Sequence, residues 1–301
     1  MDKAEIKALL KTAETLELND EERKKLPGSF IALKSGNTHY EMKGEGETIV
    51  LTHGYATPYY IYDKLFDAFV KAGYRVLRYD LLGRGFSERV RADYTPELFA
   101  AQLNELTEAL LGEESFYLVG TSMGGSVTTT FCRLYPGRVK KLILLAPAGI
   151  DSFRPPFYMK LSEIPGIGEL LFSLIGAKTL LNGCASEMYY SPSEEKDYYM
   201  KSFADAFRFK GFVKCTLSSL RHTLMRTDKT ILGYKAVAQS KIPFLCIWGK
   251  IDKTMPYYQA ERLLEVCPDV KLITYEKSGH IFVYDEGERT AADILEFLNN
   301  K

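Results

Sequence analysis

The sequence predicts an α/β fold in which a mostly parallel sheet carries helices on both faces and one long helical insertion. Apolar runs typical of buried strands alternate with helical patterns over residues 48–146, as a parallel sheet covered by helices requires. The alternation then stops, and it resumes only at Ile242. We therefore expect three parts: an N-terminal helical extension (residues 1–28), an α/β core (29–149 and 235–301) and an inserted helical cap, or lid (150–234).

The N-terminal elements are predicted from apolar spacing and from capping residues. Apolar residues recur at helical spacing over residues 3–16, which predicts an amphipathic helix. Asn19 or Asp20 can cap a second short helix. Over residues 29–43, two β-like runs flank the turn residues 35–37, Ser-Gly-Asn, which is a hairpin signal.

The core elements follow from the same two periodicities. We expect strands over residues 48–52, 75–79, 116–119, 141–146, 242–248 and 270–275. We expect helices over residues 62–70 and 95–110, after Gly124, after Pro256, and around Ile294 and Leu298 near the C-terminus. The inserted stretch carries aromatic-rich helical segments without a convincing strand.

Composition and charge exclude several classes of protein. The 301 residues include 39 Lys plus Arg and 39 Asp plus Glu, so the formal net charge is zero and no basic surface for nucleic acid is predicted. No apolar stretch is long enough to span a membrane, and the N-terminus lacks the apolar region of a secretory signal. Five cysteines without C-x-x-C spacing are typical of free thiols in a reducing compartment. We expect a cytoplasmic protein with no cofactor and no metal.

Residues 115–126, SFYLVGTSMGGS, place a strand, a sharp turn and a helix in succession. Gly120 and Gly124 flank Ser122 in a G-x-S-x-G motif. A serine hydroxyl is a poor nucleophile unless it is held within reach of a base, and the tight turn that exposes it leaves room only for glycine at the flanking positions. Ser122 is therefore the predicted nucleophile, and the N–H of Met123 at the helix start can bind a developing oxyanion.

The chain has four histidines that could act as the base: His39, His53, His222 and His280. His280 follows the last predicted strand, at the sheet edge where ligands bind in such folds, and is the predicted base. His53 is expected to shape its loop, and His39 and His222 to be structural or exposed.

An imidazole base needs a carboxylate that fixes its tautomer. Asp252 lies in the loop after the preceding predicted strand, so Ser122, Asp252 and His280 occur in the chain order Ser, Asp, His. Asp151, just past the strand that ends at residue 146, is a rival carboxylate that would suit a variant architecture.

Several motifs together resemble the α/β-hydrolase superfamily over residues 29–301. They are HG at 53–54, D-x-x-G-x-G-x-S at 80–87, G-x-S-M-G-G at 120–125, W-G-x-x-D-x-x-x-P at 248–256 and S-G-H at 278–280. Within that superfamily, YLVGTSMGGSV followed by LYPGRVKKLILLAPAGI is similar to capped serine esterases and monoacylglycerol-lipase-type enzymes. The resemblance implies an α/β-hydrolase fold with Ser122 as nucleophile, Asp252 as acid and His280 as base. It also places Tyr55 and Met123 at the two positions whose backbone N–H groups form the oxyanion hole.

The resemblance implies a serine hydrolase that cleaves carboxylic esters through an acyl-enzyme. We expect a small-molecule ester with an apolar acyl or aromatic group, such as a monoacylglycerol or a short to medium acyl ester. Ser122 stands where epoxide hydrolases and haloalkane dehalogenases carry aspartate, which argues against those activities. A carbon–carbon bond hydrolase of vinylogous diketones is an alternative, but such enzymes usually have tryptophan after the catalytic histidine, where this chain has Ile281. A ligand receptor that keeps the hydrolase fold is a further alternative.

Overall fold

The computed structural model describes residues 13–151, 161–164, 166–172 and 176–300 of the chain. The predicted helix over residues 3–16 therefore lies mostly outside the described residues. The second predicted helix is confirmed as α2 (Asp20–Arg23). The side chain of Asn19 caps it by accepting a hydrogen bond from the N–H of Glu22 at 2.9 Å, which satisfies one of the donors that a helix start leaves free.

Eight strands form one sheet in the order β1-β2-β4-β3-β5-β6-β7-β8. Their bounds are β1 (Ser29–Leu33), β2 (Gly36–Lys43), β3 (Thr48–Thr52), β4 (Arg75–Tyr79), β5 (Phe116–Thr121), β6 (Val139–Leu145), β7 (Phe244–Gly249) and β8 (Lys271–Tyr275). The β1–β2 pair is the predicted hairpin, β2 pairs antiparallel with β4, and the other pairs are parallel. β7 begins at Phe244 instead of Ile242, because Pro243 has no N–H to donate to a ladder. The predicted α/β-hydrolase sheet is confirmed.

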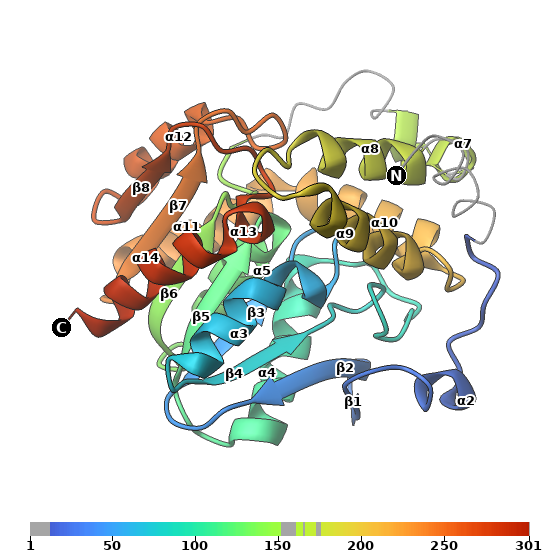
Figure 1. Cartoon of the computed structure of the whole chain (residues 1–301), viewed down its shortest axis with the longest axis horizontal. Coiled ribbons are helices and arrows are strands. Elements are labelled where there is room, and N and C mark those ends of the chain that lie inside the picture. The colour runs from blue at the N-terminus through green and yellow to red at the C-terminus, as the bar shows by residue number, and fades with distance from the viewer. Residues whose placement is uncertain (1–12, 152–160, 165, 173–175, 301) are drawn as a thin grey trace.

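Helices cover both faces of this sheet (Figure 1). Helices α3 (Asp63–Lys71) and α14 (Gly287–Asn299) pack against each other, and α4 (Pro96–Leu111), α5 (Met123–Leu134) and α11 (Thr227–Gln239) form a second group. Strands β3, β5 and β7 are buried at every position, which is why they read as continuous apolar runs. Shorter elements complete the core: η1 (Tyr59–Tyr62), α12 (Tyr258–Val266) and α13 (Phe282–Asp285).

The described residues between β6 and β7 form helices and no strand. Besides α11 they are η2 (Leu161–Glu163), α7 (Ile167–Leu171), α8 (Ala177–Ser186), α9 (Ser193–Ala206), α10 (Phe212–Ser219) and the π-helical turn η4 (Leu220–Leu224). Figure 1 shows α8, α9 and α10 lying together on one side of the sheet. Because α11 packs against α5, the expected boundary at residue 234 falls inside a helix that joins the core. We therefore propose that the cap ends before Thr227.

Helix length bears on the expected absence of a membrane span. The long core helix α4 has 16 residues, whereas a spanning helix needs about 20 apolar residues. Across the described part of the chain, no helix is both long and apolar enough to cross a membrane.

Candidate active site

Ser122 sits in a sharp reversal of the chain between β5 and α5. Its φ of 52° and ψ of −122° lie in a region that L-residues rarely adopt, at a cost of about 1–3 kcal/mol. Neighbouring backbone over-determines this conformation. The N–H of Ser122 donates to the carbonyl of Leu145 at 3.0 Å, and its own carbonyl accepts from the N–H groups of Gly125 and Ala148, both at 2.9 Å. The turn is thus fixed from both sides.

The two glycines of the motif are required by close packing around this turn. A Cβ on Gly124 would lie 2.3 Å from the carbonyl oxygen of Thr52 and 2.7 Å from that of His53. A Cβ on Gly120 would lie 2.6 Å from the carbonyl oxygen of Gly124. Real Cβ atoms do not approach backbone so closely, so the expectation that these glycines make room for the turn is confirmed.

The loop after β3 lies directly against Ser122. A Cβ built on Gly54 would meet Ser122 Cβ at 3.1 Å and Oγ at 3.6 Å. His53 Nδ1 donates to the carbonyl of Gly54 at 2.9 Å, and its Nε2 accepts from the N–H of Leu81 at 2.9 Å. These partners define a neutral imidazole, and burial lowers the pKa of His53 to about 4. His53 therefore shapes its loop, as predicted, and holds the peptide unit that carries the N–H of Tyr55.

Tyr55 is held on its other side by a buried arginine. Arg84 Nε donates to the carbonyl of Tyr55 at 2.7 Å, and the Arg84 side chain is fully buried. Across the turn, Met123 is the first residue of α5, so its N–H has no acceptor within the helix. The two backbone N–H groups predicted to bind an oxyanion thus belong to Met123, which follows Ser122 in the chain, and to Tyr55, which follows the Gly54 that packs against Ser122.

The structure brings Asp252 and His280 together. His280 Nδ1 and Asp252 Oδ2 are 2.7 Å apart, and both residues are buried. Asp252 Oδ1 accepts from the N–H groups of Thr254 at 2.8 Å and Met255 at 2.6 Å. Backbone donors thus orient the carboxylate, and the carboxylate orients the imidazole with its proton on Nδ1 and Nε2 left as the basic nitrogen.

The surroundings of His280 raise the pKa of its imidazole above the ordinary value. Burial alone lowers that pKa, because it penalises the charged ring. The charge of Asp252, its hydrogen bond and the charge of Glu187 act in the opposite direction and prevail. Within the described residues, Ser122 Oγ makes no hydrogen bond to His280. Nucleophile–base contacts are often loose in enzymes without substrate.

The other candidates lie apart from this pair. His39 is buried, and its ring nitrogens contact Asp80 Oδ2 at 2.8 Å and the carbonyl of Pro27 at 2.9 Å, which is a structural role. His222 Nε2 lies 3.4 Å from Asp93 on a partly exposed surface. The backbone carbonyl of Asp151 accepts from the Thr227 hydroxyl. In the described part of the chain, no group of three or more His, Cys, Asp and Glu side chains could hold a metal ion.

One residue of this neighbourhood was missed by the sequence prediction. The buried carboxylate of Glu187, at the end of α8, accepts hydrogen bonds from the N–H groups of Lys253 and His280. No sequence signal marks it, because a glutamate in a polar helical segment is normally solvated.

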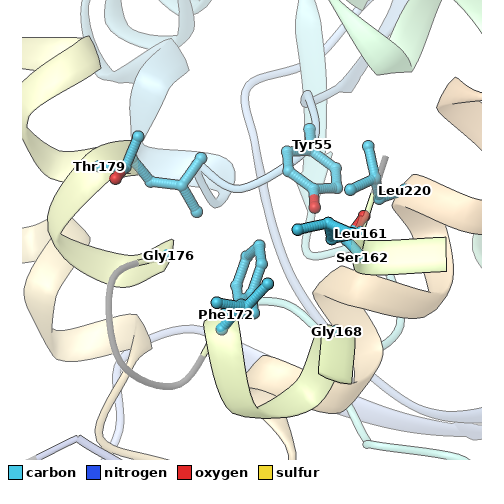
Figure 2. Close-up of a pocket in the computed structure, with 10 residues that line it drawn as sticks. Tyr55, Leu161, Ser162, Gly168, Phe172, Gly176, Thr179 and Leu220 are labelled. Carbon is cyan, nitrogen blue, oxygen red and sulfur yellow. The ribbon is translucent and has the colours of Figure 1, made fainter. Parts of the chain in front are cut away.

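An apolar cavity of about 130 Å³ opens beside Tyr55. Figure 2 shows the hydroxyl of Tyr55 pointing toward the middle of the residues that line it. The lining is Tyr55, Leu161, Ser162, Gly168, Leu171, Phe172, Gly176, Thr179, Leu180 and Leu220. The described lining includes no charged side chain. The cavity therefore suits a compact apolar group beside Tyr55.

Comparison with known proteins places this geometry in a family. Residues 45–287 match the model of a family described as serine aminopeptidase, S33. A 2-hydroxy-6-oxononadienedioate/2-hydroxy-6-oxononatrienedioate hydrolase from Burkholderia vietnamiensis is 30% identical over 279 residues, which cover 86% of this chain and 90% of the relative. Lipase 3 from a Moraxella species is 26% identical over 253 residues, covering 84% and 77%. The solved structure of an esterase from Exiguobacterium antarcticum has a TM-score of 0.76 at 21% identity, covering 91% of this chain and all of that one.

The crowding at Gly124 predicts a specific loss of stability. Gly124→Ala should lower the free energy of unfolding by about 3 kcal/mol or more, because the added methyl group meets backbone that cannot move away. Gly183→Ala is the matched control: it lies within α8 with open space around it, and alanine there should add up to about 1 kcal/mol. Urea unfolding of both variants tests this. Equal stability of Gly124→Ala and the parent would contradict the packing argument.

Proposed function

The chain belongs to the serine aminopeptidase S33 family of α/β hydrolases and is a hydrolase, and from that premise we propose that it cleaves carboxylic esters through Ser122, His280 and Asp252. The observation that carries the proposal is the buried 2.7 Å contact between His280 Nδ1 and Asp252, in a chain whose Ser122 occupies a strained turn. In this proposal Asp252, and not Asp151, is the carboxylate that orients His280.

In the proposed reaction, Ser122 Oγ attacks the ester carbonyl and His280 Nε2 accepts the hydroxyl proton. The N–H groups of Tyr55 and Met123 stabilise the oxyanion, a contribution of about 3 kcal/mol for one such donor in comparable sites. His280 then passes the proton to the leaving alcohol. Water, deprotonated by His280, attacks the acyl-enzyme, and collapse of the second tetrahedral intermediate releases the acid and restores Ser122.

The cavity favours a compact acyl or aryl group as the part of the substrate that enters it. Its volume of about 130 Å³ is close to that of an engineered apolar cavity in another protein, about 150 Å³, which takes up benzene. The Tyr55 hydroxyl is buried and lacks a hydrogen-bond partner among the described residues. Burial raises its pKa, so it stays protonated and can donate to a substrate oxygen.

A carbon–carbon bond hydrolase is the second candidate, because the Burkholderia vietnamiensis relative is named for that substrate class. Two features favour the ester. Ile281, buried beside His280, stands where such hydrolases usually carry tryptophan. The described lining of the cavity also offers no cation for the two carboxylates that a dienedioate carries, and burial of an unpaired carboxylate is costly.

The first test is loss of the nucleophile. Ser122→Ala should lower ester hydrolysis by about 10⁶-fold, the size of the loss when such a serine is removed elsewhere, while the protein stays folded. A fluorophosphonate probe should label the parent at Ser122 and leave the variant unlabelled, as read by peptide mass spectrometry. Labelling at another serine, or unchanged turnover by the variant, would overturn the proposal. Ligand binding with negligible turnover by the parent would favour a receptor.

The pH dependence tests the acid. Because the pKa of His280 is raised above its ordinary value of about 6.5 and the base must be neutral, kcat/KM should rise with pH through a midpoint above 6.5. Asp252→Asn removes the largest force that raises this pKa, so the midpoint should fall and kcat should drop by up to about 10⁴-fold, as in a serine protease triad. Asp151→Asn is the control and should change neither. The reverse result would make Asp151 the acid.

A substrate panel separates the two candidate reactions. Among p-nitrophenyl esters, kcat/KM should be highest for short or aromatic acyl groups and should fall for long chains that exceed the cavity. Under the same conditions, a 2-hydroxy-6-oxodienoate ring-fission product should be turned over at least about 100-fold more slowly, because its carboxylate would be buried without a partner. Faster turnover of the ring-fission product than of every ester would establish the second candidate instead.

A further inference from the structure

A single buried carboxylate from the inserted helical segment contacts both loops that carry Asp252 and His280. Glu187 follows the last residue of α8 and is 2% exposed. Its Oε1 accepts from the N–H of Lys253 at 3.1 Å and from the hydroxyl of Thr254 at 3.0 Å. Its Oε2 accepts from the N–H of His280 at 3.0 Å. One side chain therefore connects the residue after Asp252 to His280 itself.

A second carboxylate makes the reciprocal connection from the core. Asp285, in α13 just beyond His280, is 7% exposed. Its oxygens accept from the N–H groups of Tyr189, Tyr190 and Ser191, with shortest distances of 2.6, 2.9 and 2.6 Å. These three residues lie shortly after Glu187 in the chain, separated from it only by Met188. Two carboxylates thus hold the chain that leaves α8 on the core. Glu187 belongs to the insertion and accepts from core loops, whereas Asp285 belongs to the core and accepts from the insertion.

Burial of a carboxylate is costly, and hydrogen bonds from backbone donors offset that cost only when several are made. A purely structural anchor could use any core surface. The half-buried pair Lys64–Glu195 joins α3 to α9 at 2.6 Å, and among the described residues Glu195 accepts no hydrogen bond from the segments that carry Asp252 and His280. Glu187 instead accepts hydrogen bonds from the two peptide segments that set the distance between Asp252 and His280.

We propose that Glu187 is a positioning residue that holds the Asp252 and His280 loops in register, so that the seating of the inserted segment governs the geometry of the catalytic base. The inference deepens the proposed function and rests on it for its kinetic consequences. The bond to the His280 N–H fixes the backbone from which the imidazole reaches Asp252. An error of about 1 Å in such a position can cost up to about 100-fold in rate.

The charge of Glu187 acts in the same direction as its hydrogen bonds. The ionised groups that act on His280 are Asp252 and Glu187, and both raise the pKa of the imidazole against the effect of burial. Loss of the Glu187 charge should therefore lower that pKa. The acid limb of the pH profile then moves to lower pH, which a merely structural anchor would not produce.

The test compares Glu187→Gln with Glu195→Gln in the full-length protein. Glu187→Gln keeps the shape of the side chain but removes its charge and one acceptor, so kcat for a p-nitrophenyl ester should fall about 10- to 100-fold with KM changed less than about threefold. The midpoint of the acid limb should fall. Glu195→Gln removes a link between α9 and the core without touching either loop and should leave kcat, KM and the midpoint unchanged.

A readout that does not need turnover keeps the inference separate from the proposed function. In ¹H–¹⁵N NMR, the titration midpoint of His280, assigned with His280→Gln among the four histidines, should fall in Glu187→Gln. Absence of ester turnover by the parent would overturn the proposed function, and this lower midpoint would still support the positioning of His280. A folded Glu187→Gln protein with parental kcat and parental His280 titration would overturn the inference. If Glu187→Gln is unstable, Asp285→Asn, which loosens the same segment, should move both readouts in the same direction, and unchanged values would overturn it.

Discussion

The reversal of the chain at Ser122 is the constraint on which the rest of the site depends. A φ of 52° at a serine persists only when contacts with the surrounding structure contribute more stabilising free energy than the strained backbone costs. Here the support comes from β6, whose Leu145 carbonyl receives the Ser122 N–H, and from the end of β3, whose carbonyls close over Gly124. Ser122, the proposed nucleophile, is therefore positioned by the order of strands in the sheet, with β3 and β6 on either side of β5.

Three buried histidines of the core show how surroundings assign different states to one residue type. His53 has one acceptor and one donor as partners and is neutral. The ring nitrogens of His39 contact the carboxylate of Asp80 and the carbonyl of Pro27, so neither nitrogen is left for a substrate. His280 faces a carboxylate at Nδ1, which leaves Nε2 for proton transfer. Among the three, His280 has the arrangement that a general base requires.

The sequence predicts the core and its strand ends well because both have local signatures. The hairpin turn and the start of α4 at Thr95 reflect interactions between residues close in the chain. The G-x-S-x-G spacing around Ser122 is a local pattern too, although Gly124 packs against the distant end of β3. The insertion is less predictable, since α11 has the same helical period whether it packs on the core or in a cap. Glu187 could not be predicted at all, because its partners are some 66 and 93 residues away in the chain and arise only when the insertion folds back.

The choice between ester and carbon–carbon bond cleavage depends on the pocket more than on the catalytic residues, which both chemistries share. Identities of 30% and 26% to relatives of the two kinds differ too little to decide. A difference of one methylene in the cavity is worth about 0.8 kcal/mol, whereas burial of an unpaired carboxylate costs several kcal/mol. The described lining residues carry no charge, and such a lining discriminates against a dienedioate far more strongly than cavity shape discriminates between acyl groups. That asymmetry supports the proposed neutral ester, and Figure 2 shows the Tyr55 hydroxyl directed toward the middle of the residues that line the cavity.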